Sequence, residues 1–146
     1  MNSYGRWSVS RTEAHFWSYL QGKISPYWAA QRHEDKHTKG IPDVSYSMSG
    51  INGWIELKTV RVMRGGLVNL SHFTNEQKQW LKRHGGRGGH CFLFIEITNK
   101  SIREYVMIDW RNVDIGGKML MSELIKLSCY HSSESIDLGG FINALL

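Results

Sequence analysis

The chain has 146 residues, of which 41% are apolar and 21% are charged, and it carries a net charge of +5. These values are typical of one globular domain with a substantial core. The absence of a long apolar run, of an apolar leader and of a cysteine framework argues against membrane-spanning and disulfide-stabilised secreted classes. We therefore expect a single domain over residues 1–146, located in the cytoplasm, with no membrane partner. The basic charge favours a polyanionic partner, above all nucleic acid.

The order of apolar patterns predicts a mixed domain. Helical spacing precedes Pro26, and the segment that follows fits a short strand or a weak helix. Two β-like runs, "PDVSYSM" and "GWIELKTV", flank a Gly- and Asn-containing connection and predict a hairpin. A helix capped by Thr74 comes next, then two strands, then helices at 118–130 and 138–146. The fold class expected is α/β, with a mixed central sheet flanked by helices, a core over about residues 10–110 and a C-terminal helical extension over 111–146.

Residues 33–43, "HEDKHTKGIPD", contain two motifs that point to different metals. His33, Glu34 and His37 spell H-E-x-x-H, which in a zinc protease requires both histidines on one face of a packed helix. The intervening residues are charged and polar, as in a solvated loop, so we take both histidines as loop residues. The zinc protease stays as the remote alternative.

The second motif joins Asp43 to the strand that contains Glu56 and Lys58. Residues two apart on a strand leave the same face, so Glu56 and Lys58 lie together and Leu57 points into the core. A connection over 48–53 would set Asp43 opposite Lys58. The two carboxylates and the Leu57 carbonyl would then form the all-oxygen site that Mg²⁺ prefers, with Lys58 beside it to orient water or stabilise phosphate charge.

The series "GIPD…WIELKT" resembles the signature of the PD-(D/E)xK nuclease superfamily, and in particular its VRR-NUC and Holliday junction resolvase-like group. The resemblance covers roughly residues 10–97. It implies a restriction-endonuclease-like core and a DNA endonuclease that depends on Mg²⁺, with Mn²⁺ as a substitute. It also implies branched DNA as substrate, a homodimer, and a role in recombination, repair or phage replication, within a bacterial or phage-infected cell.

Two further residues fit this group. Glu13 matches the glutamate on its first helix, which implies a role at the metal, direct or through water; from the residues alone, a capping box with Ser10 is equally good. Gln77 matches a glutamine after the E-x-K strand and could contact Lys58 or a DNA phosphate. A Thr74–Gln77 capping box explains it as well. The candidate catalytic residues are therefore Glu13, Asp43, Glu56, Lys58 and Gln77.

Basic residues gather around this motif, and as a cluster they favour DNA. The candidate DNA contacts are Lys36, His37, Lys39, Arg61, Arg64, Lys78 and Lys82. Two alternatives to a structure-selective nuclease remain: a restriction-type or flap nuclease on the same fold, and a DNA-binding protein without catalysis.

Overall fold

The computed structural model describes residues 4–34 and 37–146, with the backbone alone over 4–12. The helices are α1 (Tyr4–Ile24), α2 (Asn75–Gly85), α3 (Met121–Leu127) and α4 (Leu138–Leu145), with short 3-10 turns η1 (Ser25–Tyr27), η2 (Arg64–Gly66) and η3 (Trp110–Asn112). The strands are β1 (Ala29–Arg32), β2 (Val44–Met48), β3 (Ile51–Arg61), β4 (Leu67–Asn69), β5 (His90–Asn99), β6 (Ile102–Asp109), β7 (Lys118–Leu120) and β8 (Tyr130–Ser133).

Six of the strands form one central sheet in the order β1-β2-β3-β5-β6-β8. All neighbours are antiparallel except β3 and β5, which are parallel and are connected through β4 and α2. Strands β4 and β7 form a separate antiparallel pair. The α/β class with a mixed central sheet flanked by helices is therefore confirmed.

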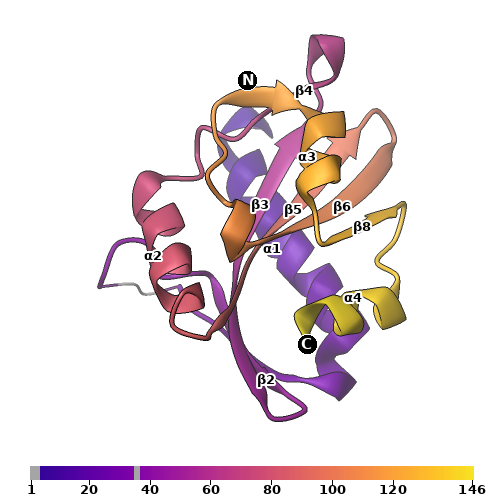
Figure 1. Cartoon of the computed structure of the whole chain (residues 1–146). Helices are drawn as coiled ribbons and strands as arrows, with labels where there is room; N and C mark the ends of the chain where they lie inside the picture. Colours follow the sequence, from indigo (N-terminus) through magenta and orange to yellow (C-terminus); the bar gives the residue numbers. More distant parts are fainter. Residues whose placement is uncertain (1–3, 35–36) are drawn as a thin grey trace.

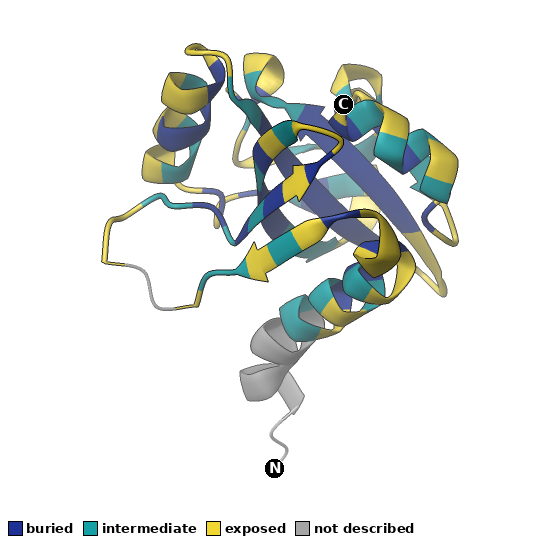
Figure 2. Cartoon of the chain, turned by 90° about the horizontal axis from the view of Figure 1, so that it is seen from below, coloured by how far each residue is buried: buried dark blue, intermediate teal, exposed yellow. Residues whose placement is uncertain are grey.

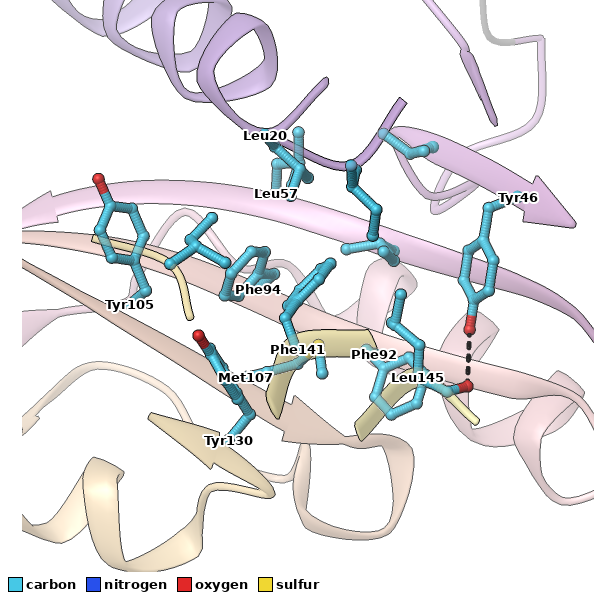
Figure 3. Packing of buried hydrophobic residues seen from close by; sticks show 14 of the residues in the cluster. Leu20, Tyr46, Leu57, Phe92, Phe94, Tyr105, Met107, Tyr130, Phe141 and Leu145 are labelled. Atoms are coloured by element: carbon cyan, nitrogen blue, oxygen red, sulfur yellow. Dashed lines mark hydrogen bonds between the residues drawn. The ribbon is translucent and has the colours of Figure 1, made fainter. Parts of the chain in front are cut away.

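Two apolar layers hold the helices to the sheet, and both figures show the sheet between them (Figures 1 and 2). On one face α1 and α4 pack through Phe16, Leu20 and Phe141. Figure 3 shows this layer, including the Tyr46 hydroxyl that donates a 3.2 Å hydrogen bond to the Leu145 carbonyl. On the other face α2, α3 and the β4–β7 pair cover a second core that includes Leu81. β5 is buried on both faces, as its apolar run predicted.

The region after residue 110 is more than a helical extension. β8 pairs with β6 at the edge of the central sheet, and β7 pairs with β4. The helix expected over 118–130 is shorter, because β7 takes its first residues and α3 ends at Leu127. At the other end of the chain, α1 begins six residues before Ser10, so Ser10 lies inside the helix and the Ser10–Glu13 capping box is wrong.

The predicted hairpin between β2 and β3 is present, but the predicted register of its two strands is wrong. Ser49 and Gly50 both adopt left-handed backbone angles, with φ of 53° and 80°, so the turn needs only two residues. The ladder pairs Val44 with Ile55, and the next step places Asp43 level with Glu56 rather than with Lys58. The strands simply extend further into the connection than the sequence indicated.

Candidate active site

The candidate site lies where β3 extends beyond the residues that pair with its neighbour β2. Because β2 begins at Val44, it pairs only with the first part of β3. Asp43, the residue before β2, binds the next part of β3 through its side chain. The Asp43 carboxylate accepts a 2.8 Å hydrogen bond from the Leu57 backbone N–H. The Asp43 carbonyl accepts one of 2.7 Å from the His33 N–H, just after β1. Asp43 is thus fixed from both sides by backbone groups.

This arrangement also places the Leu57 carbonyl. The N–H and the C=O of one strand residue point to the same side, so the carbonyl faces the same edge of β3 as the N–H that Asp43 binds. The Leu57 side chain points into the core between α1 and the sheet, as predicted. Asp43 and Leu57 therefore contribute their oxygens at a single edge.

Glu56 and Lys58 leave β3 on the same face, as their spacing predicted. The Glu56 side chain is only 2% exposed, and its Oε2 lies 3.3 Å from Lys58 Nζ. Lys58 Nζ also donates a 3.0 Å hydrogen bond to the backbone carbonyl of His72. A buried carboxylate is costly unless charge or hydrogen bonds compensate it, and here a lysine does so directly.

Gln77 both caps its own helix and binds a side chain of the E-x-K strand, although that side chain is Glu56 rather than the expected Lys58. It closes a capping box with Thr74, since its N–H donates to Thr74 Oγ1 at 3.2 Å and its Oε1 accepts from the Thr74 N–H at 2.8 Å. Its amide nitrogen donates a 3.0 Å hydrogen bond to Glu56 Oε2. The expected partner was Lys58 or a phosphate; the side chain it binds is Glu56.

Glu13 reaches the same region from α1. A pocket of about 80 Å³ is lined by Glu13 together with Lys58, with Asn69 at the end of β4 and with His72 in the loop that follows. His72 and Asn69 were not identified from the sequence. His72 contributes a backbone carbonyl, which no side-chain pattern reports, whereas the Asn69 side chain accepts from the Ser71 N–H in an Asx-type turn that the "NLS" triplet could have indicated.

None of the described residues of the H-E-x-x-H segment is helical. His33 and Glu34 follow β1 without regular secondary structure, and residues 37–40 are bends and turns. His33 Nε2 shares a 2.8 Å hydrogen bond with Ser45 Oγ, and its ring contacts Trp54 at a centroid distance of 5.2 Å. The zinc protease alternative is therefore wrong, because its two histidines never share a helical face.

The predicted DNA contacts differ in whether their side chains are exposed and whether they already have partners within the protein. Lys36 lies outside the described residues, whereas His37, Lys39, Arg61 and Arg64 are exposed. Two lysines of α2 have intramolecular partners: Lys78 lies over the Phe73 ring at 5.4 Å, and Lys82 forms a 3.0 Å ion pair with Asp114.

The residues described hold no cluster of three or more His, Cys, Asp or Glu side chains arranged to bind a metal. The oxygens that this region brings together belong to two carboxylates and one backbone carbonyl. None of the helices in the described part of the chain is long and apolar enough to span a membrane.

Among solved structures, the chain is similar to the Holliday junction resolvase Hjc of Archaeoglobus fulgidus, an archaeal hyperthermophile. The TM-score is 0.49 and the sequence identity 14%, over 76% of this chain and 90% of the resolvase. No family model and no curated protein matches the sequence. We therefore derive the function from the site itself.

Proposed function

We propose that this protein is a metal-dependent DNA endonuclease that hydrolyses phosphodiester bonds. One observation carries the proposal: the fold buries the Glu56 carboxylate beside Lys58 and Gln77, level with an Asp43 carboxylate that a backbone N–H holds at the same edge of β3. Buried ionisable groups with specific partners concentrate at functional sites, since a core gains nothing from a carboxylate that an apolar side chain could replace.

The donor atoms fit a hard divalent cation. Asp43, Glu56 and the Leu57 carbonyl offer only oxygen, which is the ligand that Mg²⁺ and Mn²⁺ prefer, and Glu13 could assist through water. When bound, such an ion polarises the phosphate and lowers the pKa of a coordinated water. Mg²⁺ keeps several waters of its own, so two carboxylates and one carbonyl are enough protein ligands for it.

The side chains around the carboxylates have separate tasks in this proposal. Lys58, held between Glu56 and the His72 carbonyl, orients the attacking water or stabilises the negative charge that develops on the phosphate. Gln77 holds the Glu56 carboxylate in one orientation from α2. Glu13 faces the small pocket beside Lys58, where a carboxylate can accept a proton or a water hydrogen bond.

The substrate follows from charge and from the sequence motif. The net charge of +5 and the exposed cations Lys39, Arg61 and Arg64 favour a DNA backbone. The resemblance of "GIPD…WIELKT" to resolvase-like nucleases favours branched DNA, in recombination, repair or phage replication in the cytoplasm. Two symmetric nicks in a junction need two sites in fixed relation, which a twofold homodimer supplies.

A panel of DNA shapes tests this function. Labelled four-way junction, flap and linear duplex would be incubated with protein in Mg²⁺, using wild type, Asp43→Asn and Lys126→Gln. Asn keeps an oxygen that can accept from the Leu57 N–H but lacks the charge, whereas Lys126 is an exposed cation on α3. The proposal expects symmetric nicks in the junction that are lost only in Asp43→Asn.

The other outcomes separate the alternatives. Cutting of flaps or plain duplex would keep the nuclease and replace the branched substrate. Binding of DNA without cutting in Mg²⁺ or Mn²⁺ would replace the nuclease with a binding protein.

A further inference from the structure

A second concave site lies on the opposite face of the sheet from Glu56 and Lys58. A cavity of about 690 Å³ opens where β3 and β5 end and β6 begins, and α1 contributes His15 and Tyr19 to its wall. Its volume falls within the range of small-molecule sites. We call it the Glu96 cavity, after the acidic residue in its floor.

The floor of the Glu96 cavity is polar although it belongs to the sheet. Glu96 on β5 is 4% exposed, and its carboxylate accepts a 3.2 Å hydrogen bond from the Tyr105 hydroxyl on β6. Burial raises the pKa of Glu96, and the charges of Arg103 and His15 oppose this rise only in part. The Glu96 carboxyl group therefore offers a polar ligand a buried hydrogen-bonding partner that the Tyr105 hydroxyl already orients.

The rim of the cavity is basic. Arg61, Lys100 and Arg103 line it with exposed side chains, and Glu134 is the one exposed acidic residue among the lining residues described. Three cations around a concave surface attract a phosphate group, and arginine binds it through two parallel hydrogen bonds.

The rim is close to the candidate active site along the chain. Arg61 follows Lys58 by three residues on β3, which corresponds to about 10 Å along the strand. Arg61 leaves the opposite face of β3 from Lys58, and β2 pairs with β3 only as far as Ile55. A DNA strand held at Lys58 would therefore reach Arg61 by crossing this edge of β3, beyond its pairing with β2. A base within a duplex cannot enter such a cavity, because it would first have to leave its stack.

We propose that the Glu96 cavity holds an unpaired nucleotide of the DNA strand that passes through the candidate active site. Its phosphate lies among Arg61, Lys100 and Arg103, and its base lies against Glu96 and Tyr105. This inference rests on the proposed function for the choice of DNA as ligand. It makes the protein selective for DNA with an unpaired segment beside the scissile bond.

Equilibrium binding without divalent metal tests the inference, because nothing is cut under that condition. The probes are a blunt duplex and the same duplex with a single-stranded tail, each followed by fluorescence anisotropy. The variants are Arg103→Gln and Lys100→Asn, where Asn suits the left-handed backbone of Lys100, whose φ is 59°. Lys126→Gln on α3, whose side chain is 76% exposed, is the matched control for lost charge.

We expect each cavity variant to weaken binding of the tailed duplex about three- to tenfold and to flatten its salt dependence by roughly 0.7 in log–log slope. The cavity variants should bind the blunt duplex as tightly as wild type does. The control Lys126→Gln should bind both probes as tightly as wild type does. Glu96→Gln should change the relative affinities for tails of different bases, since an amide presents both a donor and an acceptor.

Equal losses for blunt and tailed DNA, or no loss beyond the control, would overturn the inference. Tight binding of free deoxynucleoside monophosphates, as strong as that of the tail, would overturn the choice of a DNA strand. A protein that prefers tails through these residues but never cuts DNA would contradict the proposed function alone. A protein that cuts DNA but shows no effect of the cavity variants would contradict this inference alone.

Discussion

The side-chain amide of Gln77 on α2 donates a 3.0 Å hydrogen bond to the Glu56 carboxylate on β3, while the same residue closes the capping box of its own helix with Thr74. The start of α2 and the orientation of Glu56 are therefore set by one side chain. This coupling explains why the helix after the E-x-K strand lies against the candidate site, and it can be dissected because Thr74 takes part only in the cap.

The first prediction separates the two roles of Gln77. Thr74→Ala removes the cap alone and should lower the free energy of unfolding by about 1 kcal/mol, with cleavage per folded molecule unchanged. Gln77→Ala removes the cap and the Glu56 contact, and should in addition slow cleavage by about tenfold, as loss of a group that orients a metal ligand does. Urea unfolding and single-turnover cleavage measure the two effects. An equal loss of cleavage in both variants would show that only the cap matters.

The second prediction concerns Lys58. Lys58→Met removes the charge beside Glu56. It should slow cleavage by about a hundredfold or more, since the proposed function assigns this charge to the reacting phosphate. Lys82→Met is the control, because Lys82 carries the same charge on α2 but pairs with the exposed Asp114. We expect that variant to keep the single-turnover rate at saturating protein. A rate for Lys58→Met within a few fold of wild type would remove Lys58 from the mechanism.

The third prediction concerns the turn that sets the register of Asp43. Ser49 has a φ of 53°, which asparagine tolerates better than serine, and Asn-Gly is the preferred pair for such a two-residue turn. Ser49→Asn should therefore raise the free energy of unfolding by about 0.5 kcal/mol and leave cleavage unchanged. Thermal unfolding measures the gain. A glycine inserted after Gly50 lengthens this tight turn and should instead lower the free energy of unfolding; a variant as stable as wild type would contradict the two-residue turn.

The fourth prediction is a pH dependence of stability that arises at Glu96. Burial raises its pKa in the folded protein above the ordinary value of 4.5, so the native state binds this proton more tightly than the unfolded chain does. The free energy of unfolding should therefore fall as pH rises from 4.5 through the raised pKa, and stay lower above it. Glu96→Gln has no titratable group at this position, so its free energy of unfolding should lack this fall with rising pH. Urea unfolding at a series of pH values measures the difference between the two proteins; parallel curves would contradict the raised pKa.

Much of the scaffold was predictable from the sequence because its signals are local. The limits of α2 follow from Thr74 at its start and glycines at its end, and the double burial of β5 follows from its continuous apolar run. The shared face of Glu56 and Lys58 follows from strand periodicity alone.

What the sequence did not show depends on tertiary contacts or on atypical residues. The register of Asp43 was wrong because serine is not the usual residue for the left-handed position that Ser49 occupies. β8 was taken as part of a helix and a loop because "YHSS" has no apolar alternation, and it forms by pairing with β6. The contact between Lys58 and the His72 carbonyl uses a backbone group from a distant loop, which no residue pattern reports.

In the proposed function, Asp43 and Glu56 hold a divalent ion that the hydrolysis of DNA requires. The most direct test is the single-turnover rate of junction nicking as Mg²⁺ is added to protein freed of metal by EDTA, for wild type and Asp43→Asn. We predict no cutting without metal, a saturable rise in rate for wild type, and a rate at least a hundredfold lower for Asp43→Asn at every concentration. Cutting that persists in EDTA, or an Asp43→Asn variant that follows the wild-type curve, would contradict the metal site proposed at this edge of β3.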